Sequence, residues 1–186
     1  MNQRYESGDC AMTRAVHPMT LELQGLNVTY RSQRGCVHAL KDCSFSVSKG
    51  DIVGLVGESG SGKSSALMAI PRLLPKGTLV SGRIFCDGED ISALKGRFIN
   101  AWRWRRIALV PQGASASFTP HISIGNHIAE VLVFHLNKTG REAEQCAVDL
   151  LRTVGLDASF FGRYPHELSG GQKQRCAFAR AMICNP

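Results

Sequence analysis

Nine residues between positions 57 and 65 have the types and the spacing of a phosphate-binding loop. They read Gly57, Glu58, Ser59, Gly60, Ser61, Gly62, Lys63, Ser64 and Ser65, which contains the pattern Gly-x-x-x-x-Gly-Lys-Ser. Glycines let the backbone approach a phosphate without a Cβ clash, and consecutive N–H groups can then converge on the anion. Lys63 would reach the β- and γ-phosphates, and the Ser64 hydroxyl would bind Mg²⁺.

The flanking residues indicate a strand before this loop and a helix after it. The segment 51–57 is mostly apolar, as a buried strand of a parallel sheet is, and helix formers follow from Gly62 to about Arg72. This context disfavours the alternative interpretation, a glycine-rich turn that holds no ligand. The loop by itself predicts a nucleotide without indicating which kind of protein binds it.

A second anion-binding pattern lies near the end of the sequence. It consists of Leu168, Ser169, Gly170, Gly171 and Gln172. The serine hydroxyl can cap the helix that begins here, and the first N–H groups of that helix lie at the positive end of its dipole. A plain helix cap is the alternative. Between the two patterns, the short, nearly all-apolar segment 106–112 suits a central strand of a parallel sheet, and Gln112 lies at its C-terminal end, where open α/β sheets place ligands.

In this order, the loop, Gln112 and the Leu-Ser-Gly-Gly-Gln segment resemble the ATP-binding-cassette (ABC) ATPases. The resemblance implies that residues 57–65 are the Walker A loop for ATP, with Lys63 and Gln112 as catalytic residues and Ser64 and Gln112 as Mg²⁺ ligands. It also implies that residues 168–172, the signature segment, contact the ATP of a second, head-to-tail subunit. Tyr30 stands where the family has an aromatic that stacks on adenine, although a core or edge aromatic explains it equally well.

Longer stretches are similar to the ATPases of dipeptide, oligopeptide and nickel importers, namely residues 54–65, 110–112 with 117–120, and 164–175. The resemblance implies an energy-coupling subunit whose ATP hydrolysis drives transmembrane permease subunits. The implied partners are a second ATP-binding subunit in a homo- or heterodimer, the permease and, indirectly, a periplasmic or extracellular solute-binding protein; no nucleic acid is expected. The protein would be peripheral, on the cytoplasmic face of the cell membrane. Gly113-Ala114 replace the usual Asp-Pro, so the sequence does not decide which solute is transported.

One part of the ABC machinery is not found in the sequence. Family members continue from an Asn-Pro like that at 185–186 into an apolar strand that ends in Asp-Glu, the Walker B aspartate and the catalytic base, and later carry a switch histidine. The 186 residues contain no apolar run that is followed by Asp-Glu. Because phosphoryl transfer depends on positioning the attacking water, we expect a C-terminally truncated cassette that binds MgATP weakly, hydrolyses little ATP alone and exposes sheet edges.

The order of elements indicates an α/β P-loop NTPase cassette. We expect a flexible tail at 1–18 and a partial nucleotide-binding domain at 19–186, with an N-terminal antiparallel β subdomain, a RecA-like, mostly parallel sheet core, and a helical subdomain at about 113–168 that carries the signature segment. Strands are expected near 21–30, 39–50 and 81–88, the last with an Asp-Gly turn at 87–88, and helices near 92–102, 123–136, 139–154 and 172–183. Thr139 and Ser169 are the expected N-caps.

The composition and charge limit which other classes of protein the sequence fits. No apolar run approaches the roughly 20 residues that span a bilayer, and the first twenty residues lack the apolar core of a signal peptide. The seven cysteines and six histidines form no C-x-x-C or H-x-x-x-H pair, which favours incidental or buried thiols over a metal site. A net charge of +7, with the basic and aromatic stretch 102–106, leaves nucleic-acid contact open beside amphipathic packing. The alternatives are an ABC ATPase that acts on nucleic acid or the ribosome, a hydrolysis-incompetent fragment, and a P-loop kinase, which the signature segment argues against.

Overall fold

The computed structural model describes residues 19–32, 35–113 and 117–186, and these fall into two units. The first unit contains the described residues up to Ala66 together with Pro75–Ser92, and the second contains Leu67–Leu74 and Ala93–Pro186. The predicted tail at 1–18 and the Ala114 departure lie outside the described residues. No helix in the described part of the chain is both long enough and apolar enough to cross a bilayer.

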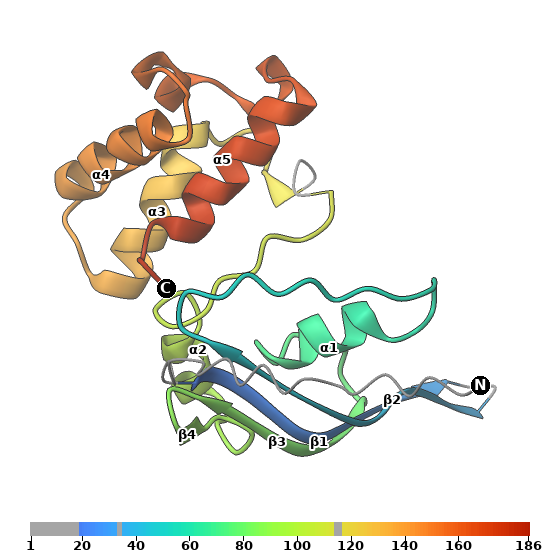
Figure 1. The fold of residues 1–186 in the computed structure, drawn as a ribbon. Helices are drawn as coiled ribbons and strands as arrows, with labels where there is room; N and C mark the ends of the chain where they lie inside the picture. Colours follow the sequence, from blue (N-terminus) through green and yellow to red (C-terminus); the bar gives the residue numbers. More distant parts are fainter. Residues whose placement is uncertain (1–18, 33–34, 114–116) are drawn as a thin grey trace, which may run out of the picture. The chain divides into compact units, whose positions relative to one another are not determined.

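The first unit is built on an antiparallel sheet whose strand order is β2-β1-β3-β4 (Figure 1). The strands are β1 (Met19–Ser32), β2 (Gly35–Ser48), β3 (Leu79–Cys86) and β4 (Glu89–Asp90). The side chains of Leu23, Leu26 and Val28 from the central strand β1 are buried, and Leu23 lies opposite Ile84 of β3. This confirms the predicted antiparallel β subdomain, including the turn at Asp87-Gly88, whose residues both have positive φ.

The two apolar segments predicted as parallel strands, 51–57 and 106–112, are not strands in the structure. Ile52 and Val56 are 101% and 91% exposed, and the only pairing near the second segment is an isolated parallel bridge between Arg103 and Ile107 among the described residues. A strand is held by hydrogen bonds to a neighbouring strand, and neither segment has such a neighbour within its unit. The prediction of a buried strand before the loop is therefore wrong for the described residues.

Helix α1 (Lys63–Ala69) follows the loop, as predicted, but it is shorter than expected. The predicted end was near Arg72. Instead Arg72 adopts a positive φ of 57° and its N–H donates to the carbonyl oxygen of Ala69, so the chain turns before the predicted end is reached. The boundary between the two units falls inside this helix.

Helices dominate the second unit. They are α2 (Arg97–Trp102), α3 (Ile124–Leu136), α4 (Gly140–Thr153) and α5 (Gly170–Met182), with the 3₁₀ helices η2 (Ala158–Gly162) and η3 (Pro165–Glu167). Helices α3, α4 and α5 lie side by side and share one core that includes Ile128, Leu151 and Cys176 (Figure 1). Burial raises the pKa of the Cys176 thiol to about 11, so this thiol stays protonated and inert at neutral pH.

Side-chain caps fix where the three long helices begin. The Ser123 hydroxyl accepts from Asn126 N at α3, and full capping boxes form at Thr139 with Glu142 and at Ser169 with Gln172. The N-caps predicted at Thr139 and Ser169 are confirmed, although α5 begins two residues before the predicted Gln172. Helix α2 is shorter than the predicted 92–102, since Gly96, with φ 53°, precedes its first residue.

Replacing Gly125 of α3 by alanine should destabilise the second unit by about 1–3 kcal/mol. A Cβ built at this position would lie 2.1 Å from the ring of Phe161, so the ring would have to move. Gly140, the first residue of α4, has nothing within 4 Å of the corresponding position, so Gly140→Ala is the matched control. Chemical unfolding of both variants measures the difference, and equal stabilities would show that Phe161 moves without cost.

Candidate functional site

The predicted phosphate-binding loop is closed around the side chain of Lys63. The Lys63 ammonium donates to the carbonyl oxygens of Gly57 at 2.8 Å and Glu58 at 2.5 Å, and to the Ser61 hydroxyl at 3.2 Å. Gly57, Gly60 and Gly62 all have positive φ, which lets the backbone wrap round the ammonium. The loop therefore already holds one polar group, the Lys63 ammonium, among its own oxygen atoms.

Strand β2 supports this loop from one side. A Cβ at Gly62 would lie 2.2 Å from the carbonyl oxygen of Ala39, so only glycine permits the observed approach between the loop and β2. Sequence reasoning missed this contact, because it depends on pairing between residues far apart in the chain. The alternating pattern of β2 predicted a strand but not which backbone atom would meet the loop.

Tyr30 also reaches the beginning of α1. Its hydroxyl donates to Ser65 Oγ at 3.0 Å, and Ser65 is buried while the neighbouring Ser64 is exposed. The structure thus brings Tyr30 and residues 57–65, all predicted from the sequence, into one place within the first unit. The exposed position of Ser64 leaves its hydroxyl accessible to a ligand from solvent.

The residues present fit a magnesium-bound nucleotide phosphate. The Lys63 ammonium donates to neutral oxygens of its own loop, and a phosphate would offer it acceptors of opposite charge, so these bonds can be exchanged for phosphate. The Ser64 hydroxyl is the hard oxygen ligand that Mg²⁺ prefers. Within the described residues, no three His, Cys, Asp or Glu side chains gather into a metal cluster.

The signature segment is anchored at one end and open at the other. Leu168 is buried in the helical core, whereas Ser169, Gly170 and Gly171 are exposed. Ser169 Oγ accepts from Gln172 N at 3.3 Å, and Gln172 Oε1 accepts from Ser169 N at 2.9 Å. Among the described residues, a Cβ at either glycine would meet nothing within 4 Å, so their packing gives no reason for glycine at these two positions. The contact of this segment with the ATP of a second subunit stays a prediction.

Gln112 lies in an exposed turn of the second unit, next to Gly113 with φ 74°. Lys63 belongs to the first unit and Gln112 to the second, so the Mg²⁺ role of Gln112 stays a prediction.

The basic stretch 102–106 is used in part for internal bonding. Arg103 donates to the carbonyl oxygens of Pro71 and Arg72, and Arg105 donates to that of His135. For these two arginines the structure favours packing over nucleic-acid contact.

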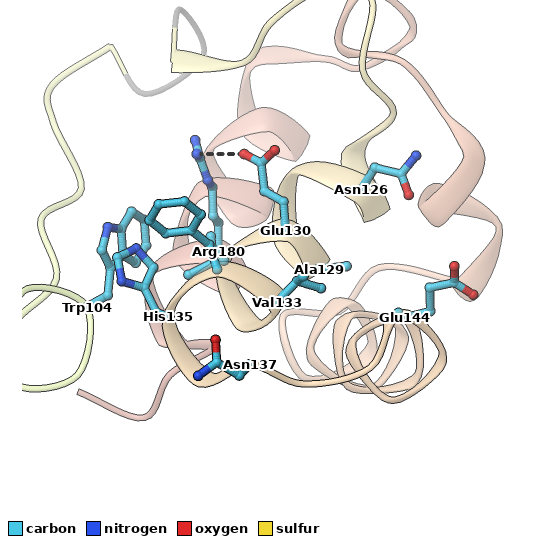
Figure 2. A pocket seen from close by; sticks show the side chains of 12 residues that line it. Trp104, Asn126, Ala129, Glu130, Val133, His135, Asn137, Glu144 and Arg180 are labelled. Atoms are coloured by element: carbon cyan, nitrogen blue, oxygen red, sulfur yellow. Dashed lines mark hydrogen bonds and ion pairs between the residues drawn. The ribbon is translucent and has the colours of Figure 1, made fainter. Parts of the chain in front are cut away.

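An open pocket of about 900 Å³ lies on the second unit, and none of the predicted site residues lines it. Figure 2 shows the side chains around it, including Trp104, Glu130, His135 and Arg180. Arg180 Nη2 pairs with Glu130 Oε1 at 3.3 Å, and the Arg180 guanidinium lies over the Trp104 ring. Partial burial, helped by nearby Arg105, lowers the pKa of His135. Among these four residues, only Trp104 lies in a stretch that the sequence marked, because Glu130, His135 and Arg180 come together only when α3 and α5 pack.

Comparisons with known proteins agree with this geometry. Residues 40–186 match the family described as ABC transporter. The probable D,D-dipeptide transport ATP-binding protein DdpD of Escherichia coli (strain K12) is 40% identical over 170 residues, which are 89% of this chain and 52% of that protein. The oligopeptide transport ATP-binding protein OppF of Bacillus subtilis (strain 168) is 40% identical over 167 residues, which are 89% of this chain and 54% of that protein.

The chain therefore spans about half the length of these two curated relatives. Among solved structures, the dimeric post-hydrolysis state of the ATP-binding cassette MJ0796 bound to ADP and Pi superposes with a TM-score of 0.78 at 28% identity. That similarity covers 89% of this chain and 70% of the cassette. Because the family match includes both the loop around Lys63 and the signature segment, the chain belongs to the ABC transporter family.

Proposed function

We propose that the chain is the ATP-binding, energy-coupling part of an importer for peptides, nickel or a related small solute. The observation that carries the proposal is the pairing of a loop folded around the Lys63 ammonium with an exposed Gly170-Gly171 step that the chain's own packing does not require. Relatives named for dipeptide and oligopeptide transport favour peptides over nickel.

Each residue of the loop has a defined part in binding ATP. On phosphate arrival, the Lys63 ammonium exchanges its loop oxygens for β- and γ-phosphate oxygens, while the glycine backbone surrounds the anion. The Ser64 hydroxyl and, from the second unit, Gln112 would hold Mg²⁺. The metal, when bound, offsets negative charge on the phosphates. The Tyr30 ring, placed beside Ser65, offers a face on which adenine can stack.

In the proposed dimer, the signature segment contacts the ATP that is bound to a second subunit. Its exposed glycines and capped helix start suit the γ-phosphate of ATP bound to a partner arranged head to tail, which is either an identical or a related chain. The similar cassette MJ0796 was solved as a dimer with ADP and Pi. ATP binding and hydrolysis in such a pair would drive transmembrane permease subunits supplied by a solute-binding protein, with this chain peripheral on the cytoplasmic face of the membrane.

We further propose that these 186 residues bind ATP much better than they cleave it. No apolar run followed by Asp-Glu occurs in them, so no carboxylate in the family's position orients the attacking water. Catalysis of phosphoryl transfer consists almost entirely of positioning the reactants, here including that water, and of electrostatic stabilisation.

Replacing Lys63 by alanine should weaken MgATP binding by about 10- to 150-fold, because charge-assisted hydrogen bonds are worth about 1.5–3 kcal/mol. Titration calorimetry on the 186-residue chain measures the affinity. Lys76→Ala, which removes an exposed lysine of the same unit, is the matched control and should leave binding unchanged. Phosphate release should stay near background in every variant, and vigorous turnover that depends on Lys63 would contradict the proposed lack of hydrolysis.

Two substitutions at Tyr30 separate its ring from its hydroxyl. Tyr30→Ala should weaken ATP binding by about 5- to 150-fold, equivalent to about 1–3 kcal/mol of stacking, whereas Tyr30→Phe should bind nearly as well as the unsubstituted chain. Competition with a fluorescent ATP analogue measures both. If Tyr30→Phe is as weak as Tyr30→Ala, the hydroxyl bond to Ser65 matters and the stacking role is wrong.

Gly170 and Gly140 form a matched pair for testing the signature. Each is the first residue of a helix with a capping box, and each leaves the space of a Cβ open. Alanine at either position should leave stability within about 1 kcal/mol. Only Gly170→Ala should weaken ATP-dependent association of the subunits, measured by sedimentation velocity with Mg²⁺, because its Cβ would obstruct the partner's phosphate. Equal association by the two variants would contradict the role of the signature segment.

A further inference from the structure

Helix α1, whose first residue is Lys63, ends in a turn that is held by other parts of the chain. The N–H of Leu73 donates to the carbonyl oxygen of Met68 at 2.8 Å, and the N–H of Arg72 donates to that of Ala69 at 2.9 Å. This pair of bonds is the Schellman motif, whose turn residue has left-handed backbone angles and is usually glycine. Here it is Arg72, with a φ of 57°. A side chain in that conformation costs free energy, so surrounding contacts must hold it there.

The guanidinium of Arg103, directly after α2, supplies these contacts. Its Nε donates to the carbonyl oxygen of Pro71 at 2.7 Å, and its Nη2 donates to that of Arg72 at 2.6 Å. These carbonyl groups belong to the peptide bonds on the two sides of the Arg72 Cα. Nη1 donates to Asn100 Oδ1 of α2 at 3.1 Å, which fixes the direction of the side chain. One planar group therefore holds both peptide bonds, a geometry that a lysine ammonium does not reproduce.

The side chain of Arg72 makes the reverse connection. Its Nη1 donates to the carbonyl oxygen of Leu94, ahead of α2, at 2.7 Å. Burial and the positive charge of Arg72 lower the pKa of Arg103, but an arginine stays charged at neutral pH. Two like charges are thus brought together with partial burial, and the hydrogen bonds to backbone oxygens have to offset that cost. The end of α1 and the region around α2 are therefore joined by bonds in both directions.

The turn that carries Arg103 leads directly to Gln112. The N–H of Trp104 donates to the carbonyl oxygen of Ile107 at 2.9 Å, and Arg103 and Ile107 form an isolated parallel bridge. From Ile107 the chain runs on to Gln112, and Val110 between them packs against the helical core. The segment that ends at Gln112 is therefore attached, through Arg103, to the end of α1 within the second unit.

We propose that Arg103 is a positioning residue for ATP binding, which fastens the end of α1 to the segment that ends at Gln112 so that the two move together. The attachment itself concerns the chain without nucleotide. Its consequence, that ATP arriving at Lys63 changes the segment leading to Gln112, rests on the proposed function. In this role the guanidinium acts through the backbone and not on the nucleotide or the metal.

Amide hydrogen exchange on the 186-residue chain without nucleotide tests the attachment. In Arg103→Gln, the amides of Arg72 and Leu73 should exchange about 10-fold faster or more, because the charge-assisted hydrogen bonds that hold their turn are lost. Arg105→Gln is the matched control, since the Arg105 guanidinium also donates to a backbone carbonyl oxygen, that of His135. It should leave both amides unchanged. Equal exchange in Arg103→Gln and the unsubstituted chain would overturn the attachment.

Exchange at residues 107–112, compared with and without saturating MgATP, separates positioning from a purely structural role. In the unsubstituted chain and in Arg105→Gln, MgATP should change this exchange by about 5-fold or more, the lower end of ordinary coupling between sites. In Arg103→Gln the change should be lost. A residue that only stabilises the fold would alter exchange equally in both states, so an ATP-dependent change that persists in Arg103→Gln would contradict the proposal.

Two further measurements keep the proposal open to refutation if Arg103→Gln folds poorly. Arg103→Lys keeps the charge but not the planar fork, so it should give an intermediate effect in both experiments, and behaviour identical to the unsubstituted chain would remove Arg103 from the role. The second measurement needs no variant. If the unsubstituted chain binds MgATP in titration calorimetry and residues 107–112 do not respond, the coupling is wrong. If it does not bind MgATP, the proposed function is overturned, while exchange at Arg72 and Leu73 still decides whether Arg103 holds α1.

Discussion

The carbonyl oxygen of Ala39 lies where a side chain at position 62 would have to stand, and the arrangement of the phosphate-binding loop depends on that contact. With glycine there, the loop rests against β2 and α1 starts at the next residue, Lys63. The ammonium can then turn back onto the carbonyl oxygens of Gly57 and Glu58. β1, which pairs with β2, brings the Tyr30 hydroxyl to Ser65. One backbone approach thus organises every candidate ATP-binding residue in the first unit.

In the second unit, helix α5 begins with two glycines, and other contacts keep the start of this helix folded. Leu168 and Cys176 anchor the two sides of the helix start in the core shared by α3, α4 and α5. The capping box satisfies the N–H groups of Ser169 and Gln172, which offsets part of the conformational cost of Gly170 and Gly171. The exposed glycine step is therefore held by the buried Leu168 before it and by the capping box around it.

The apolar residues before the loop are exposed for a physical reason, and the same reason limits how well a hydrophobic pattern predicts a strand. Ile52 and Val56 have the composition of a strand buried on both faces, but burial and pairing need neighbouring strands, and the described residues provide none. The segment after Gln112 shows the opposite case. Thr119 and Ser117 look like ordinary loop residues, yet His127 and Arg180 fix both of them.

The sequence alone determined the features that depend on neighbours along the chain. Glycine spacing at 57–62 predicted the loop, and Thr139 with Glu142 predicted the start of a helix, because their bonds join residues a few positions apart. Periodicity likewise predicted α3 and α4, and the Asp-Gly pair predicted the turn at Asp87-Gly88. Local chemistry is sufficient for such elements, since the partners are already close in the unfolded chain.

Only the tertiary structure decided what depends on residues far apart in the sequence. The clash that requires Gly62, the Tyr30 bond to Ser65, and the group of His127, Glu130 and Arg180 all join different elements. The missing pairing at 51–57 belongs to the same class, because a strand exists through its neighbours and composition supplies only the tendency to be one. Hydrogen bonding and packing between distant segments, which no local pattern encodes, settled these points.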